Sequence, residues 1–226
     1  MGGKHKYRPG KPSEAVASPG FVEIPYVSRG GLKLRRALDE FGIDCTGLRC
    51  ADLGCSTGGF TDCLLQAGAA RVFAVDTAYG ELAWKIRRDD RVTVMERTNA
   101  VHTGPPAEVV ETGGVDLVVI DLGWTPQSRA IPAALDWVYG RGSARIVSLI
   151  KPHYEVEKSE LGEKGVLDHA RAAEVTESVR AAMPGLGVRV LGCIESPIIG
   201  GKRSGSGKGT GNKEWLVLLE AIDAPG

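Results

Sequence analysis

Residues 50–60 read Cys50-Ala51-Asp52-Leu53-Gly54-Cys55-Ser56-Thr57-Gly58-Gly59-Phe60, and this order predicts a short buried strand, a glycine-rich turn and the start of a helix. The next apolar run, Arg71–Val75, is followed by Asp76. A glycine turn after a first strand, with an acid about 20 residues further on, is typical of α/β sites that bind a nucleoside. The glycines let a ligand approach the backbone, and the acid accepts hydrogen bonds from ribose hydroxyls.

The spacing of the glycines indicates which kind of nucleotide fits. The pattern is Asp-x-Gly-x-x-x-Gly-Gly from Asp52 to Gly59, whereas a pyrophosphate-binding turn has Gly-x-Gly-x-x-Gly. This difference favours a ligand with one nucleoside and no diphosphate, such as S-adenosylmethionine. It disfavours a dinucleotide-dependent oxidoreductase.

Length and composition set limits on the class of protein. A chain of 226 residues with 42% hydrophobic residues fits one domain with short extensions. No apolar run reaches membrane-spanning length, and the start Met1–Lys6 is not followed by the apolar segment of a secretory signal. Five cysteines without a Cys-x-x-Cys pair favour unpaired thiols in a reducing cytoplasm. The four histidines are scattered, so we predict no metal site. The lack of a spanning apolar run predicts no membrane partner.

The net charge is zero, but basic residues gather in two places. The first lies within residues 1–36, where only Glu14 and Glu23 oppose Lys4, Lys6, Arg8, Lys11, Arg29, Lys33, Arg35 and Arg36. The second is a glycine-serine segment with Lys202, Arg203, Lys208 and Lys213. Local positive patches attract nucleic acid even when the total charge is neutral. Tails that only solubilise the chain explain the pattern equally well.

The chain is predicted to be one domain after a basic tail. Residues 1–24 have the composition of a disordered segment, and residues 25–226 form the domain. A first helix is predicted at 29–41, with Ser28 as its N-cap and Gly42 at its end. Strands are predicted at 48–53, 71–76, 91–96, 115–121, 144–150, 188–193 and 215–219. Further helices are predicted at 58–67, 79–88, 126–138 and 168–182.

The strands predict the architecture. Runs such as 115–120 and 146–150 are almost continuously apolar, which indicates burial on both faces and therefore a parallel sheet. The last two strands have no helix between them, so we expect an antiparallel pair at one edge. A seven-stranded, mostly parallel sheet with helices on both faces and such a pair is the class I, Rossmann-like methyltransferase fold.

Two charged residues directly follow apolar strands. Asp121 comes directly after the run 118–120, and Lys151 comes directly after the run 147–150. Ligands of open α/β sheets bind beyond the carboxyl ends of the strands. Polar residues are also common there because the chain returns to solvent, so Asp121 alone leaves both interpretations open. Pro152 restricts the backbone of Lys151.

Six motifs occur along the chain in an order typical of one enzyme family. They are Tyr26-Val27-Ser28-Arg29-Gly30-Gly31-Leu32-Lys33-Leu34, Ser56–Ala69, Tyr79–Lys85, Glu96–Ala100, Ile150-Lys151-Pro152 and Gly211–Glu214. Together they resemble the FtsJ-like ribose 2′-O-methyltransferases, and most closely the TlyA branch of haemolysins and rRNA methyltransferases. The similarity extends from about residue 26 to residue 221.

The resemblance implies a catalytic Lys-Asp-Lys-Glu tetrad, which falls on Lys33, Asp121, Lys151 and Glu214. A ribose hydroxyl is a poor nucleophile, and it must lose its proton as the methyl group moves. A lysine acts as a base only when its pKa falls, and a second ammonium nearby lowers that pKa. Lys151 is the candidate base, with Lys33 as its neighbour. The two carboxylates are expected to orient the lysines and the target hydroxyl. They also raise the lysine pKa that the second ammonium lowers, and the sequence alone leaves open which effect is larger.

S-adenosylmethionine is the cofactor that the resemblance implies. Its contacts are expected at Asp52, Gly54, Ser56, Thr57, Gly58, Asp76, Asn99 and Asp121. Asp76 is expected to hold the ribose, and Asn99 is expected to lie near the adenine. Each assignment has a structural alternative. Gly58 and Gly59 can serve only to pack the helix on the strand, and Asn99 can serve only as a turn residue.

Two departures from the family pattern bear on the substrate. TlyA members usually begin with a small RNA-binding domain, in whose place this chain has a short basic tail. The segment after the catalytic Asp is Leu122–Gln127 instead of a Val-Ser-Phe-like sequence. Its Trp124 either stacks on a base or packs under the domain. The loop at 200–211 is long and basic, and is either a phosphate-binding flap or a tolerated insertion.

We therefore expect a cytoplasmic RNA ribose 2′-O-methyltransferase that acts on ribosomal RNA. A small-molecule O-methyltransferase is the alternative enzyme, and the complete tetrad argues against it. A haemolysin-like membrane-active protein is the non-enzymatic alternative, and the sequence has no basic amphipathic surface helix to support it. His153, Tyr154 and Glu155 are interpreted as surface-loop residues.

Overall fold

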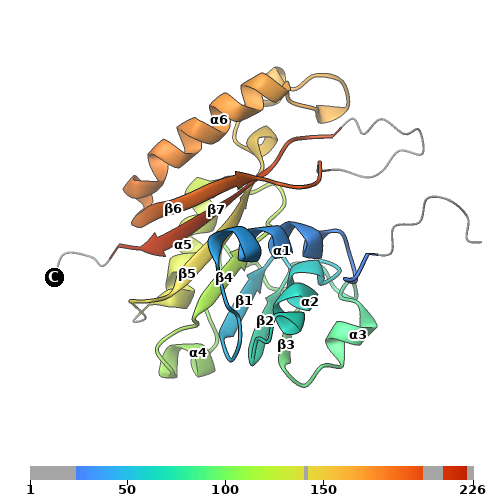
Figure 1. The fold of residues 1–226 in the computed structure, drawn as a ribbon, viewed down its shortest axis with the longest axis vertical. Helices are drawn as coiled ribbons and strands as arrows, with labels where there is room; N and C mark the ends of the chain where they lie inside the picture. The colour runs from blue at the N-terminus through green and yellow to red at the C-terminus, as the bar shows by residue number, and fades with distance from the viewer. Residues whose placement is uncertain (1–23, 140–141, 201–210, 223–226) are drawn as a thin grey trace, which may run out of the picture.

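The computed structural model describes residues 24–139, 142–200 and 211–222, so the predicted tail and the basic loop lie almost entirely outside the described residues. The described part contains one seven-stranded sheet with the order β3-β2-β1-β4-β5-β7-β6 (Figure 1). The strands are β1 (Arg49–Leu53), β2 (Arg71–Val75), β3 (Val92–Met95), β4 (Leu117–Ile120), β5 (Arg145–Ile150), β6 (Val188–Glu195) and β7 (Trp215–Ala221). The first five run parallel, and β7 is antiparallel to both β5 and β6. The predicted strands and the antiparallel pair are thereby confirmed.

The central strands are buried on both faces because alternate residues enter two separate cores. In β1, Cys50 packs with α1 (Gly30–Phe41) and α2 (Gly59–Gln66), whereas Ala51 and Leu53 pack with α5 (Gln127–Val138). Figure 1 shows α1 and α2 on the near face of the sheet and α5 behind it. Continuous apolar runs are what a sheet between two helical layers requires. The edge strand β3 is only half-buried.

Most helices agree with the sequence pattern, but two local predictions are wrong. The helix predicted at 79–88 is reduced to α3 (Trp84–Arg87), because backbone hydrogen bonds hold the preceding residues as a loop: Gly80 N–H donates to Glu96, and Ala83 N–H donates to the Thr57 carbonyl. Arg29, not Ser28, occupies the N-cap of α1, although the Ser28 hydroxyl accepts from Gly30 N–H. Gly42 ends α1 in the left-handed conformation, as predicted.

The remaining elements are short except for one helix. α4 (Ala107–Glu111) was not predicted. α6 (His169–Ala182) is preceded by Asp168, whose carboxylate caps its N-terminus. Four 3₁₀ turns complete the described part: η1 (Pro152–Tyr154), η2 (Lys158–Glu160), η3 (Glu163–Gly165) and η4 (Met183–Leu186). All five cysteines are free thiols. Within the described ranges no helix has both the length and the apolar character needed to cross a membrane.

Candidate active site

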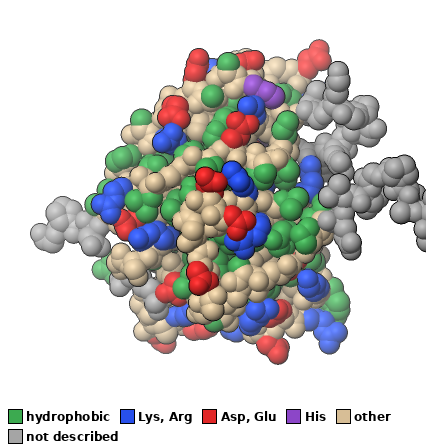
Figure 2. All heavy atoms as spheres, in the orientation of Figure 1, with side chains coloured by type: hydrophobic (Ala, Val, Ile, Leu, Met, Phe, Trp, Pro, Cys, Tyr) green, Lys and Arg blue, Asp and Glu red, His purple; other side chains and the backbone are tan. Residues whose placement is uncertain are grey.

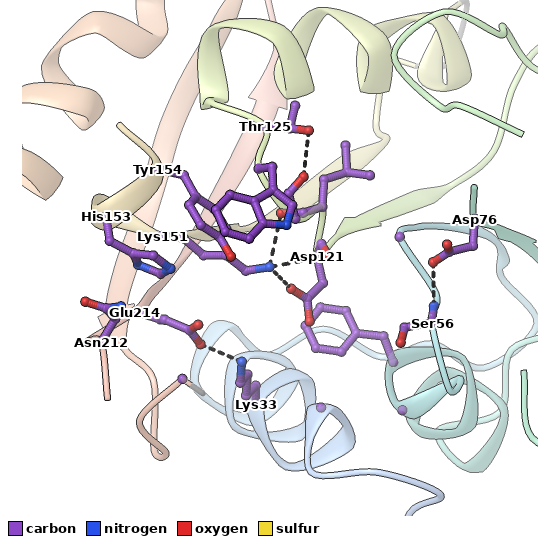
Figure 3. A pocket seen from close by; sticks show the side chains of 18 of the residues that line it. Lys33, Ser56, Asp76, Asp121, Thr125, Lys151, His153, Tyr154, Asn212 and Glu214 are labelled. Carbon is purple, nitrogen blue, oxygen red and sulfur yellow. Dashed lines mark hydrogen bonds and ion pairs between the residues drawn. The ribbon is translucent and has the colours of Figure 1, made fainter. Parts of the chain in front are cut away.

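A cavity of about 1270 Å³ lies at the carboxyl ends of the parallel strands. The sheet register explains its position. Leu53 pairs with both Val75 and Ile120, so the residues that follow these three strands emerge at one edge. Ile150 pairs with Trp215 in the antiparallel direction, so Lys151 and Glu214 lie just beyond the same edge. Figure 3 shows the side chains that converge there from opposite ends of the sequence.

The glycine turn forms one side of this cavity. Gly54 has a φ of +94°, and a Cβ on it would lie 2.7 Å from the Asp121 carbonyl oxygen, so the turn and the loop after β4 touch only because residue 54 is glycine. Ser56 N–H donates to Asp76 Oδ2 at 2.7 Å, and Ala78 N–H donates to Asp76 Oδ1 at 2.8 Å. Both carboxylate oxygens of Asp76 are thus oriented while the side chain still lines the cavity.

The predicted cofactor contacts divide into two groups. Gly54, Ser56, Asp76, Asn99 and Asp121 line the cavity, whereas Asp52, Thr57 and Gly58 do not. Asn99 also has the turn role considered for it, because its Oδ1 accepts from Val101 N–H at 3.0 Å. A Cβ on Gly58 would lie 2.8 Å from the Leu82 side chain, so close helix packing accounts for that glycine.

Asp52 lies beneath the cavity and is completely buried. Thr61 Oγ1 donates to its Oδ2 at 2.6 Å, and its Oδ1 has no hydrogen-bond partner. Burial raises the pKa of Asp52 to about 7, a rise that the Thr61 hydrogen bond opposes and the charge of Asp121 reinforces. Asp52 therefore joins β1 to α2 through Thr61 rather than facing the cavity.

The four tetrad residues form two ion pairs beside the cavity. Lys33 Nζ lies 2.5 Å from Glu214 Oε2, and Lys151 Nζ lies 2.5 Å from Asp121 Oδ1. Lys151 also donates to the Leu122 carbonyl at 3.1 Å. Opposite charges at this separation in a mostly buried setting fix the side chains in one arrangement. The structure therefore assembles all four predicted side chains at one site.

The segment after Lys151 contributes more than the sequence indicated. The interpretation of His153, Tyr154 and Glu155 as surface-loop residues is wrong: all three are half-buried, and His153 and Tyr154 line the cavity. Burial, and then the charges of Lys151 and Lys33, lower the pKa of His153 to about 4, so its imidazole stays neutral near pH 7. Glu155 accepts from Gln127 N–H and thereby holds the start of α5.

Trp124 is an exposed residue of the cavity wall rather than a core residue. Its side chain is 82% exposed, and its ring centroid lies 4.8 Å from that of Tyr154 with an interplanar angle of 32°. Its φ is +56°, an uncommon value for a bulky residue. Strained backbone of this kind often occurs at functional sites. The alternative that Trp124 packs under the domain is excluded by its exposure.

The basic loop begins and ends next to Glu214. Gly200 N–H donates to the Asn212 carbonyl at 2.9 Å, so the two ends of the loop are held together. A Cβ on Gly200 would lie 2.1 Å from Glu214 Oε1. Asn212 Oδ1 in turn accepts from Leu167 N–H at 2.8 Å. Over the residues with described coordinates, no group of His, Cys, Asp and Glu is arranged to hold a metal ion.

The strand order, the glycine turn and the oriented Asp76 define a class I methyltransferase. Residues 26–206 match the family model of the FtsJ-like methyltransferases, and the chain belongs to this family. The 16S/23S rRNA (cytidine-2′-O)-methyltransferase TlyA of Mycobacterium tuberculosis is 42% identical over 217 residues, which cover 92% of this chain and 76% of the relative.

Two further relatives carry a different designation. Hemolysin A of Brachyspira hyodysenteriae is 32% identical over 86% of this chain and 76% of its own length. A solved structure designated a hemolysin, from Streptococcus thermophilus, superposes with a TM-score of 0.78 at 36% identity and covers 90% of this chain and 70% of that one. The chain is therefore similar to proteins that bear both names.

Proposed function

We propose that this protein transfers a methyl group from S-adenosylmethionine to a ribose 2′-hydroxyl of ribosomal RNA in the cytoplasm. The observation that carries the proposal is the pairing of Lys33 with Glu214 and of Lys151 with Asp121 beside one cavity. The family and the rRNA-modifying relative supply the substrate class. The complete tetrad argues against a small-molecule acceptor.

The residues at the Asp76 end fit the nucleoside of S-adenosylmethionine. Each Asp76 oxygen accepts one backbone N–H and retains lone pairs for ribose hydroxyls. Asn99 and the neighbouring Thr98 and Ala100 line the cavity next to Asp76, where an adenine follows the ribose. When bound, S-adenosylmethionine supplies a methyl group on an already reactive sulfonium. The chain has only to align the acceptor with it.

The tetrad end fits the acceptor. As the 2′-oxygen forms its bond to the methyl carbon, the carbon–sulfur bond breaks and the hydroxyl proton leaves for a base. Lys151 is the proposed base, and its ammonium must first lose a proton to solvent. Asp121 and the Leu122 carbonyl hold Lys151 Nζ in place for this transfer. Lys33 and Glu214 form the neighbouring pair that orients the hydroxyl.

The exposed ring of Trp124 gives the acceptor nucleotide a surface to stack on. RNA is usually read through unpaired bases that stack on aromatic side chains. Trp124 and Tyr154 lie together at the cavity wall, and the Tyr154 ring centroid lies 5.8 Å from Lys151 Nζ. A base stacked on Trp124 would bring its own ribose toward Lys151. The exposed Lys158 and Lys164, which also line the cavity, suit the flanking phosphates.

Methylation of ribosomal RNA with radiolabelled S-adenosylmethionine tests the proposal. Naked 16S and 23S rRNA and intact subunits, all from a strain without the enzyme, serve as separate substrates, with Lys151→Ala as the matched control. We expect label in one RNA species and, after nuclease digestion, in a 2′-O-methylated nucleoside. Label on a base rather than the ribose, or no label in any RNA, contradicts the proposal.

A further inference from the structure

Two exposed aromatic rings near α3 are each covered by an arginine. Tyr79 and Trp84 are both 68% exposed. The guanidinium of Arg97 lies 4.2 Å from the centroid of the Tyr79 ring, and that of Arg88 lies 5.6 Å from the Trp84 ring. A single exposed aromatic needs no explanation. Two rings five residues apart in the sequence, each within cation–π range of an arginine, indicate a prepared surface, which we call the α3 surface (Tyr79, Trp84, Arg88 and Arg97).

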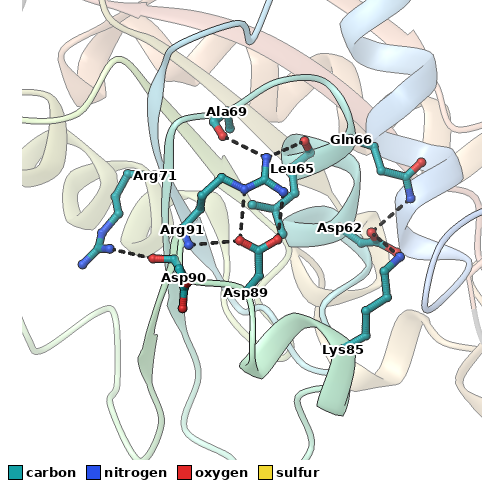
Figure 4. A network of polar contacts seen from close by, with 9 residues as sticks. All are labelled: Asp62, Leu65, Gln66, Ala69, Arg71, Lys85, Asp89, Asp90 and Arg91. Carbon is teal, nitrogen blue, oxygen red and sulfur yellow. Dashed lines mark hydrogen bonds and ion pairs between the residues drawn. The ribbon is translucent and has the colours of Figure 1, made fainter.

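The charges around the α3 surface leave its two arginines available. Arg87 pairs with Glu96, Lys85 pairs with Asp62, and Arg91 pairs with Asp89. Figure 4 shows the last two of these pairs in the network beside α3. Among the described residues no carboxylate lies within ion-pair distance of Arg88 or Arg97, although the pKa of Glu96 is lowered by its partner Arg87 and, to a smaller extent, by the charge of Arg97. Figure 2 shows positive and hydrophobic side chains together at the lower right, where Figure 1 places α3.

The α3 surface is held rigidly against the glycine turn of the active site. Ala83 N–H donates to the Thr57 carbonyl at 3.0 Å, and Gly80 N–H donates to Glu96 Oε1 at 2.7 Å. Leu82 and Ile86 are buried, and Leu82 packs on Gly58. A rigid surface loses little conformational entropy when it binds a partner. Its attachment to Thr57 and Gly58 also fixes its position relative to the cavity.

We propose that the α3 surface binds single-stranded RNA that flanks the acceptor nucleotide, with bases stacked on Tyr79 and Trp84 and phosphates near Arg88 and Arg97. The inference rests on the proposed function, because it names where the same RNA continues beyond the cavity. Every base has a π-face, so aromatic rings and arginine planes bind unpaired RNA without requiring a sequence. Unpaired positive charge complements the phosphate backbone.

Binding of labelled oligouridine, followed by fluorescence anisotropy, tests the α3 surface in the full-length protein. We expect the double variant Tyr79→Ala/Trp84→Ala to bind at least about tenfold more weakly, since each stacked base contributes roughly 1–3 kcal/mol. The double variant Tyr79→Phe/Trp84→Phe keeps both rings and should bind nearly as the wild type does. Tyr139→Ala is the matched control, because Tyr139 is 85% exposed but follows α5 at the opposite end of the strands.

Several outcomes overturn the inference. The first is unchanged oligouridine affinity in the alanine variant, or no oligouridine binding by the wild type. The second is a parallel loss of S-adenosylhomocysteine affinity, which would place Tyr79 in the cofactor site. The third is a changed sedimentation coefficient of the alanine variant, which would indicate a protein contact. Wild-type protein that methylates no RNA removes the proposed function, whereas equal methylation by the wild type and the alanine variant removes only the α3 surface.

Discussion

Lys33 and Glu214 lie 181 residues apart in the sequence, yet their charged atoms are 2.5 Å apart. Their side chains are only 11% and 5% exposed. The pair joins the first helix to the last strand, because Lys33 lies on α1 and Glu214 directly precedes β7. Two charges buried this deeply are compatible with folding only when they remain together.

Separating this pair should destabilise the fold. Lys33→Met leaves the Glu214 carboxylate buried without a partner, and Glu214→Gln does the same to the Lys33 ammonium. Each should lower the free energy of unfolding by about 3 kcal/mol. The double variant should lose clearly less than the sum of the two single losses. Urea unfolding of all four proteins measures this coupling, and strictly additive losses would show that the ion pair contributes nothing.

Lys151→Ala should abolish methyl transfer while the protein still folds and still binds S-adenosylhomocysteine. Loss of a general base lowers turnover by about 10²- to 10⁴-fold. Lys151→Arg should be equally inactive, because a guanidinium stays protonated at any working pH. Single-turnover assays on the RNA substrate, with calorimetry of cofactor binding as the control, measure both properties. Turnover near that of the wild type in either variant would exclude Lys151 as the base.

Asp76→Ala should weaken S-adenosylhomocysteine binding by roughly 1.5–3 kcal/mol, the contribution of hydrogen bonds to a charged group. The reason is that Asp76 lines the cavity with both oxygens oriented by Ser56 and Ala78. Calorimetry measures the change. NAD is the comparison ligand for the wild type, and binding of NAD as tight as that of S-adenosylhomocysteine would contradict the cofactor assignment.

The stability of the protein should depend on pH through Asp52. Its pKa is about 7 in the folded protein and has an ordinary value of 3.8, so between about pH 4 and pH 7 the folded state keeps a proton that the unfolded state releases. Stability therefore falls as the pH rises through this window, by a few kcal/mol, and does not change further above it. Asp52→Asn removes this contribution. Urea unfolding across this pH range measures the free energy of unfolding of both proteins. The difference between wild type and variant should fall with rising pH, and a difference that does not change with pH would refute the prediction.

The sequence predicted the sheet well because its information is local. Apolar runs buried on both faces, such as β4 and β5, can occur only between two helical layers, and chain order then leaves few topologies. The helix at 79–88 failed for a nonlocal reason: the Gly80 and Ala83 amides bond to Glu96 and Thr57 instead of continuing a helix.

The sequence predicted the four charged residues that the structure brings together, but not which of them pair. Lys151 meets Asp121 because β4 and β5 pair in parallel. Glu214 is placed by the antiparallel register of Ile150 with Trp215, and no local pattern encodes either pairing. His153 and Tyr154 were missed because a 3₁₀ turn directly after Lys151 directs the chain back over the cavity. Their position immediately after a lysine that ends a strand was the one available signal.

The basic loop should govern RNA affinity through its charges. Lys202, Arg203 and Lys208 lie in the loop whose ends, Gly200 and Asn212, are bonded together next to Glu214. Phosphate contacts release counterions, so the affinity for RNA should fall steeply as salt rises. Replacing the three residues by glutamine should flatten that dependence and raise the apparent KM for RNA, with cofactor affinity unchanged. Filter binding across a salt series measures the slope. The double variant Lys158→Gln/Lys164→Gln shows, for comparison, how much the lysines of the cavity contribute to it. If the slope and KM stay unchanged even after residues 1–20 are also deleted, the two basic segments are only solubilising and a substrate other than RNA gains support.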